Sequence, residues 1–247
     1  MKGPQGSSET REIDISIVVP VYNEEKNLPI LIPNLVEVLG PLGRSYEMIF
    51  VDDGSTDGSR EILKAMVSQY PQVRLLGFKK NCGETAAIAG GLKEAKGKVL
   101  ITLDADLQND PKDIPGFLEY LKEYDMVTGW RQKRHDPWIK RITSKIANGI
   151  RNKLSGETIR DSACTFKAYK RECLQNLKLY KGMHRFMPTL VKLEGFRVIE
   201  IPIAHHPRRF GVSKYATWNR MGRTFVDLLA VKWMKNRHIR YEIEERI

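Results

Sequence analysis

Short apolar runs that alternate with helix-forming segments constrain the fold of this chain more than any other feature. The runs at residues 15–21, 47–51, 73–78, 99–103 and 125–129 are rich in aliphatic residues and leave no polar face. Strands of this kind are buried on both sides, and helical connections between them make them parallel. The pattern predicts an α/β fold with a mostly parallel, Rossmann-like sheet and helices on both faces. The connecting helices are expected at residues 28–39, 57–70, 84–96 and 110–123.

Polar residues follow each predicted strand. In open parallel sheets, ligands bind beyond the carboxyl ends of the strands, so these loops are the expected place for chemistry. The loops begin at Tyr22, Asp52, Lys79, Asp104 and Trp130. One rim of the sheet is therefore predicted to gather an aromatic ring, several carboxylates and several cations.

The run Asp104-Ala105-Asp106-Leu107-Gln108 predicts a metal site. Two carboxylates at positions i and i+2, with an amide carbonyl at i+4, are the oxygen ligands that Mg²⁺ or Mn²⁺ prefers, and such an ion carries a substrate diphosphate. An isolated Asp-x-Asp is common, and a strand end followed by a solvated turn explains it equally well. Its place on a polar rim favours the metal.

Asp52 and Asp53 begin a second acidic loop that continues to Gly58. Turn and helix-cap chemistry accounts for Asp57 in this loop. It does not account for the two carboxylates before the turn. These are able to accept hydrogen bonds from the N–H groups of a uracil or guanine base, with the ring of Tyr22 beside it. The loop therefore predicts a nucleoside site.

Cationic residues gather directly after the run at Asp104. Residues 129–153 hold eight Lys or Arg and one acid, in a chain whose formal net charge is +11. A solvated helix face explains many such runs, but the neighbouring diphosphate site favours phosphate binding here. A nucleic-acid-binding protein without catalysis is a remote alternative, because the carboxylates of the rim would repel nucleic-acid phosphates. No nucleic acid partner is expected.

The cysteines and the N-terminus indicate the cellular compartment. Cys82, Cys164 and Cys173 cannot all pair within the chain and show no metal-binding spacing, which favours a reducing cytoplasm. Residues 1–12 lack an apolar run and are predicted to be a flexible tail, not a signal peptide.

An apolar stretch near the C-terminus, residues 225–234, is interrupted by charges and is shorter than the roughly 20 residues of a spanning helix. One helical face of this region is apolar and is flanked by basic residues. Such a face usually belongs to a core, yet it also suits the surface of an anionic membrane. Its members are Met221, Phe225, Leu228, Leu229 and Trp233.

Three motifs resemble the family-two glycosyltransferases of the GT-A fold: Pro20-Val21-Tyr22-Asn23-Glu24, Val51-Asp52-Asp53-Gly54-Ser55 and the run from Asp104 to Gln108. Leu103 to Gln108 with Pro111 resembles the branch that contains dolichyl-phosphate mannose synthase and the bacterial polyprenyl-phosphate glycosyltransferases. Later segments agree with this branch, at residues 129–131, 161–171 and 206–215. The resemblance covers roughly residues 14–235.

The resemblance implies an inverting transfer of a sugar from a nucleotide-sugar donor to a polyprenyl phosphate acceptor. The same donor chemistry with a glycan, lipid or protein hydroxyl is the alternative. A GT-A catalytic domain is expected over residues 13–210, followed at 211–247 by an acceptor loop and a C-terminal amphipathic helix. The expected location is cytoplasmic and peripheral, at the cytoplasmic face of the membrane, with an anionic membrane surface and a separate membrane-anchor subunit as partners.

The site residues follow from the same resemblance. The donor nucleotide is expected at Pro20, Tyr22, Glu24, Asp52, Asp53, Asn81 and Gly83. Mg²⁺ or Mn²⁺ is expected at Asp104, Asp106 and Gln108. Catalytic roles fall to Asp161, Arg131 and Arg141, and the acceptor phosphate and its loop to Ser144, Arg208, Ser213 and Lys214.

Asp161 has three alternative roles. A hydroxyl acceptor requires a general base, for which Asp161 is the candidate. A phosphate acceptor, whose second pKa is about 6, is already nucleophilic at neutral pH, so Asp161 would then only orient Lys or Arg side chains. A helix or turn cap is the third alternative.

Overall fold

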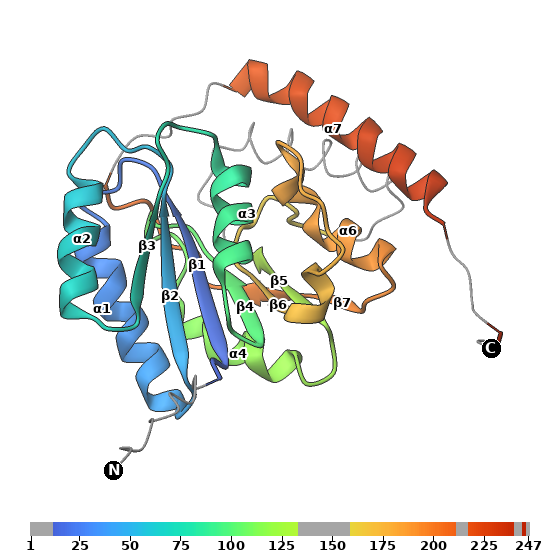
Figure 1. Cartoon of the computed structure of the whole chain (residues 1–247). Helices are drawn as coiled ribbons and strands as arrows, with labels where there is room; N and C mark the ends of the chain where they lie inside the picture. Colours follow the sequence, from blue (N-terminus) through green and yellow to red (C-terminus); the bar gives the residue numbers. More distant parts are fainter. Residues whose placement is uncertain (1–11, 133–158, 211–216, 240–243, 246–247) are drawn as a thin grey trace, which may run out of the picture.

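A seven-stranded sheet in the order β3-β2-β1-β4-β6-β5-β7 organises the chain (Figure 1). The computed structural model describes residues 12–132, 159–210, 217–239 and 244–245, without the side chains of 217–224. The strands are β1 Ile15–Val21, β2 Tyr46–Asp52, β3 Val73–Gly77, β4 Val99–Thr102, β5 Met126–Arg131, β6 Lys167–Lys170 and β7 Val198–Ile203. The five strands predicted from apolar runs are confirmed.

Helices cover both faces of the sheet. They are α1 Leu28–Leu39, α2 Ser59–Gln69, α3 Glu84–Glu94, α4 Ile114–Tyr120, α6 Met187–Leu193 and α7 Thr217–Arg237. Short 3-10 turns are η1 Gly40–Leu42, η2 Pro111–Asp113, η3 Arg171–Leu174 and η4 Met183–Phe186. The helix expected at residues 110–123 is thus divided, with η2 leading into α4. The Asp110 side chain begins it by accepting a hydrogen bond from Lys112 N at 3.0 Å.

Two apolar layers sandwich the sheet, because alternate residues of each strand point to opposite faces. On one face, α1, α2 and α4 pack against odd-numbered positions of β1 such as Ile17 and Val19. On the other face, α3 and α6 pack against Val18 of β1 and its neighbours. Pro33 lies inside α1 without ending it. Burial on both faces explains why the central strand β1 contains a single polar residue, Ser16.

Strand β6 breaks the parallel pattern. It runs antiparallel to both neighbours, with Lys167 opposite Thr102 of β4 and Thr128 of β5. Strand β7 then pairs in parallel with β5 along the sheet edge. Neither strand was predicted from the sequence. Because β6 is reversed, the segment that precedes it, and not the one that follows it, lies at the carboxyl ends of β4 and β5.

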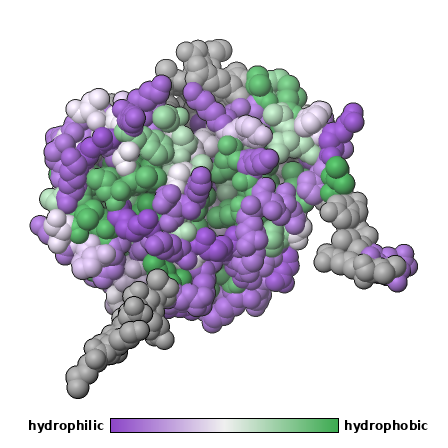
Figure 2. Space-filling view, viewed as in Figure 1, coloured by the Kyte–Doolittle hydropathy of each residue, from purple (hydrophilic) through white to green (hydrophobic). Residues whose placement is uncertain are grey.

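The C-terminal helix α7 packs on η4 and α6 at one side of the molecule (Figure 1). Leu228 and Val231 are buried in this contact, whereas Phe225, Leu229 and Trp233 are 52%, 45% and 65% exposed. The predicted apolar face is therefore divided between the core and the surface. Figure 2, in the same view, shows apolar side chains in the region of α7. Within the described ranges, no helix has the length and apolar character needed to span a bilayer.

Gly91 of α3 lies against the sheet, and we expect Gly91→Ala to destabilise the fold. A Cβ atom at this position would lie 2.3 Å from Val18 Cγ1 and 3.0 Å from Val51 Cγ2. Overpacking of this kind lowers the free energy of unfolding by about 1–3 kcal/mol, measurable by urea denaturation. The control is Gly116→Ala in α4, where a Cβ has no neighbour within 4 Å. This change is expected to stabilise the protein by about 0.5–1 kcal/mol. Equal stability of the Gly91→Ala variant and the wild type would contradict the packing described here.

Candidate active site

Asp104 and Asp106 lie in the loop that follows β4, at the rim where the parallel strands end. Leu107 adopts a left-handed conformation with φ of 61°, which is rare for a branched residue. This turn brings Gln108 N to 3.1 Å from Asp106 Oδ1, so the loop folds back around its own carboxylate. The backbone thereby holds both carboxylates at one place on the rim.

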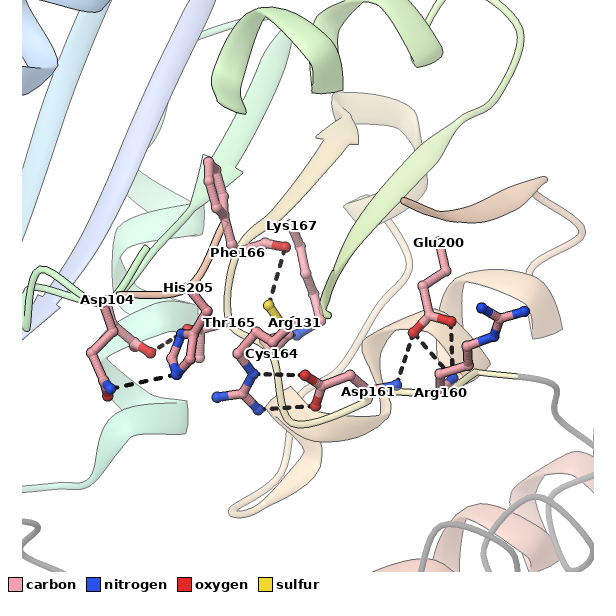
Figure 3. A network of polar contacts seen from close by, with 11 residues as sticks. Asp104, Arg131, Arg160, Asp161, Cys164, Thr165, Phe166, Lys167, Glu200 and His205 are labelled. Carbon is pink, nitrogen blue, oxygen red and sulfur yellow. Dashed lines mark hydrogen bonds and ion pairs between the residues drawn. The ribbon is translucent and has the colours of Figure 1, made fainter. Parts of the chain in front are cut away.

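Each of the two carboxylates has a partner from a distant part of the chain. Thr165 Oγ1 donates a hydrogen bond to Asp104 (Figure 3), and Arg208 Nη2 lies 2.7 Å from Asp106 Oδ2. Burial, together with the neighbouring charge of Asp106, raises the pKa of Asp104 to about 6. Burial also raises the pKa of Asp106, and the charge of Arg208 offsets this only in part. The pair therefore carries more negative charge than its surroundings neutralise.

The residues present fit a divalent cation that is shared with a substrate. No group of three or more His, Cys, Asp and Glu side chains able to hold a metal occurs in the part of the chain that the structure describes. Asp104 and Asp106 supply two carboxylates, and Mg²⁺ typically takes its other ligands from water and substrate phosphates. Gln108 directs Nε2 toward the His206 carbonyl oxygen at 3.4 Å. Its role as a third ligand remains a prediction.

Arg131 and Asp161 form a two-pronged ion pair on the same rim (Figure 3). Arg131 Nε and Nη2 donate to the two oxygens of Asp161 at 2.6 and 2.9 Å. Burial opposes the charge of Arg131, but the hydrogen bonds and charge of Asp161 hold its pKa above the ordinary value. The structure thus brings two of the three predicted catalytic residues into direct contact.

Glu200 of β7 supports this pair from behind and was not predicted from the sequence. Its carboxylate accepts hydrogen bonds from the backbone N–H groups of Arg160 and Asp161, at 2.8–3.0 Å. Burial raises the pKa of Glu200, and those two N–H groups lower it less. The Arg160 guanidinium in turn lies over the Trp130 ring, 4.5 Å from its centroid. A carboxylate inside an apolar strand gives no local sign of this function.

The nucleoside loop is built on Asp52 and Asp53, which are both buried. Asp52 pairs with Arg60 and accepts from Ser55 N at 3.0 Å. Asp53 accepts from the backbone N–H groups of Cys82 and Gly83, at 2.6 and 2.9 Å. Direct contact of either buried carboxylate with a base would use the acceptor sites that these bonds leave.

The remaining donor residues border the same loop. Pro20 pairs with Val51 between β1 and β2, and Tyr22 and Glu24 lie in the partly buried loop after β1. Glu24 Oε2 accepts from Asn27 Nδ2 at 2.5 Å. Asn81 is exposed, two residues before Gly83. Four predicted site residues, Arg141, Ser144, Ser213 and Lys214, lie outside the described residues.

Solved glycosyltransferases share this fold. Glucosyl-3-phosphoglycerate synthase from Mycobacterium tuberculosis, in complex with Mn²⁺, UDP and phosphoglyceric acid, superimposes with a TM-score of 0.67 at 17% identity, covering 92% of this chain and 80% of that chain. A mannosyltransferase from Pyrobaculum calidifontis, in complex with GDP-Man and Mn²⁺, gives a TM-score of 0.65 at 18% identity, covering 94% and 66%. The expected GT-A type of fold is confirmed.

The chain belongs to glycosyl transferase family 2, whose model matches residues 16–178. It is 35% identical over 227 residues to a dodecaprenyl-phosphate galacturonate synthase of Rhizobium johnstonii, covering 90% of this chain and 67% of that protein. It is 37% identical over 204 residues to an undecaprenyl-phosphate 4-deoxy-4-formamido-L-arabinose transferase of Edwardsiella ictaluri, covering 81% and 62%. The matched region is thus about two thirds of the length of these relatives.

Asp104→Asn is expected to make the metal-free protein more stable than the wild type at pH 8. The folded pKa of about 6 lies above the ordinary value of 3.8, so the wild type loses stability as the pH rises from about 4, where the unfolded carboxylate ionises, to about 6, where the folded one does. The difference between variant and wild type should be absent below pH 4, grow as the pH rises to about 6 and stay constant above that. Urea denaturation between pH 4 and 8 measures it.

Asp57→Asn is the control with the opposite sign. Burial raises the pKa of Asp57, but hydrogen bonds from Ser59 and from the Glu25 N–H lower it by more, so the net shift is downward. Its loss should therefore destabilise the protein at neutral pH, and the difference should disappear in acid.

In a second measurement, Mn²⁺ is expected to raise the melting temperature of the wild type but not of Asp104→Asn. Equal stabilisation of both proteins by Mn²⁺ would contradict a metal at Asp104.

Proposed function

We propose that this chain is an inverting glycosyltransferase that transfers a sugar from a nucleoside-diphosphate sugar to a polyprenyl phosphate, with Mg²⁺ or Mn²⁺ as cofactor. The observation that carries the choice of acceptor is the Arg131–Asp161 pair, in which both carboxylate oxygens accept from one guanidinium. A carboxylate engaged in this way orients a cation and is poorly placed to remove a proton from a hydroxyl. A phosphate acceptor requires no such base at neutral pH. The names of the two relatives support the same acceptor class.

In this proposal, Asp104 and Asp106 hold the cation. The bound ion supplies neutralisation of the charge that develops on the departing diphosphate. The chain adds Arg131 to this rim, held in one orientation by Asp161. Arg208 adds a second cation from the segment after β7. Guanidinium groups suit this role because their planar donors match phosphate oxygens.

The donor nucleoside is assigned to the loops after β1 and β2. Here Asp53 fixes the backbone of Cys82 and Gly83, and so sets the position of the loop that leads into α3. Gly54 allows the close approach of this loop, because a Cβ there would lie 2.6 Å from the Lys80 carbonyl carbon. Tyr22, from the loop after β1, supplies the ring face in this assignment.

The transfer reaction is tested with a panel of radiolabelled nucleotide sugars, Mn²⁺ or Mg²⁺, and a short polyprenyl phosphate. We expect label from one donor to enter an organic-extractable, acid-labile product in a metal-dependent manner. Label that appears only in a water-soluble glycan would overturn the choice of acceptor. Metal-independent binding of nucleic acid without turnover would overturn the proposed function itself.

Asp161→Asn is the variant that tests the pair with Arg131. Asparagine keeps the shape of the side chain but loses the charge that holds the guanidinium, so turnover is expected to fall by about 10- to 100-fold. Asp125→Asn is the matched control, since Asp125 also pairs with cations but directly precedes β5, at the end of that strand away from Arg131. Full turnover by Asp161→Asn would remove Asp161 from the site.

The exposed part of α7 is proposed to contact an anionic membrane surface at the cytoplasmic face, where the acceptor would be found. Phe225, Leu229 and Trp233 are 52%, 45% and 65% exposed on this helix, and Lys232 and Arg237 lie on it as well. Apolar side chains enter the lipid boundary, and each nearby cation adds about 1 kcal/mol of attraction to anionic lipid. A separate membrane-anchor subunit is proposed to bind the protein on the side of the molecule that carries α7.

Binding to anionic liposomes at low salt is therefore expected for the wild type, measured by co-sedimentation. Trp233→Ser combined with Phe225→Ser should weaken this binding by about tenfold or more, because two large apolar side chains are lost. The control is Tyr120→Ser, which removes an aromatic side chain that is 44% exposed on α4. Figure 1 places α4 and α7 on opposite sides of the molecule. No binding by the wild type, or equal loss in both variants, would contradict this surface.

A further inference from the structure

A buried lysine lies beneath the site, in the middle of the sheet. Lys167 begins β6 and is 2% exposed, between Thr102 of β4 and Thr128 of β5. A cation in this position costs free energy unless hydrogen bonds and opposite charges compensate it. The position opposite Ala168, one residue further along β6, is filled by Ile101 and Val127, as expected for the centre of a sheet. Packing alone therefore does not explain a lysine here.

The ammonium group of Lys167 holds the backbone of the segment that precedes β6. Its Nζ donates a hydrogen bond to the Cys164 carbonyl oxygen, and Figure 3 shows the side chain directed toward this segment. Thr102 Oγ1 donates to the next carbonyl, that of Thr165, at 2.6 Å. Cys164 N donates to the Asp161 carbonyl at 3.2 Å, which closes a turn. Two side-chain donors on adjacent strands thus fix successive carbonyls of one short segment.

This segment contacts both the Arg131 side chain and the carboxylate of Asp104. At its start, Asp161 binds Arg131, and near its end Thr165 donates to Asp104. A shift of the Cys164 carbonyl would move both contacts, because only three residues separate Asp161 from Thr165. Burial lowers the pKa of Lys167, and Cys164, Asp161 and Asp104 nearby oppose this only in part.

We propose that Lys167 is a positioning residue of the transfer reaction, which acts by holding the Cys164 carbonyl and with it the segment that carries Asp161 and Thr165. This inference rests on the proposed function, because its effect is measured as turnover. It differs from a role in stability alone, since the affected contacts reach Arg131 and the metal carboxylate Asp104.

The test compares Lys167→Met with Lys170→Met in the sugar-transfer assay. Lys170 lies on the same strand and pairs with Asp125 at 2.9 Å, so its loss also removes a cation and an ion pair from β6. Turnover is counted per folded molecule, from circular dichroism and the melting temperature. We expect Lys167→Met to lower kcat by about 10- to 100-fold, the cost typical of a misplaced reacting group, with donor KM changed by less than about 3-fold. Lys170→Met is expected to lower the melting temperature without lowering kcat.

Two further variants keep the inference testable if Lys167→Met does not fold. Lys167→Arg retains a buried cationic donor and should recover part of kcat. Thr102→Val is a small change that removes the donor to the Thr165 carbonyl, and it should lower kcat by roughly 5-fold with KM unchanged. If Lys167→Met folds and keeps the wild-type kcat, the inference is overturned. If only Thr102→Val folds, a wild-type kcat in that variant overturns it. Absence of transfer by the wild type would instead refute the proposed function.

Discussion

Negative charge gathered at a poorly hydrated rim is the constraint on which the rest of the site depends. Asp104 and Asp106 follow β4 and Asp161 precedes β6, so all three lie at the carboxyl ends of β4 and β5. Burial makes the ionised forms of Asp104 and Asp106 costly. Each carboxylate has a partner from a part of the chain far away in sequence. Thr165 donates to Asp104, Arg208 to Asp106, and Arg131 to Asp161. The negative charge of Asp104 and Asp106 is only partly compensated. A divalent ion would bind at these two carboxylates together with the diphosphate of the donor. In the function proposed above, the site would therefore be most stable when both are bound.

The reversed strand β6 makes this compensation geometrically feasible. In a fully parallel sheet, each strand contributes to the rim only through the loop that follows it. Because β6 is antiparallel to β4 and β5, the segment before it reaches the same rim and lies between the loops after those two strands. Asp161 and Thr165 enter the site by this route. A buried lysine at the first position of β6 then holds the entering segment to the sheet.

The sequence predicted the parallel half of the fold and the acidic loops, because both are local signals. The strands β1 to β5 are mostly apolar, and their carboxyl ends had to converge because they are parallel. By contrast, β6 is only Lys-Ala-Tyr-Lys, and Glu200 and Pro202 interrupt the apolar pattern of β7. Thr165 contacts Asp104, 61 residues away, and Glu200 contacts Arg160, 40 residues away. Lys167 contacts a residue only three positions away, but its partner is a backbone carbonyl. Composition and spacing contain no sign of such pairings.

The division of α7 between core and surface shows how one helix serves two constraints. Leu228 and Val231 anchor it to α6 and η4, and Asp227 lies against Gly182, where a Cβ would come within 2.2 Å of its carboxylate. The position of α7 is therefore fixed relative to the turn whose Gly182 N donates to Thr85 of α3 at 2.9 Å. An apolar surface on a helix tied to the catalytic body in this way is held in one orientation. A membrane contact made through it would accordingly hold the rim in one orientation relative to the lipid, which an attachment by a flexible segment would not do.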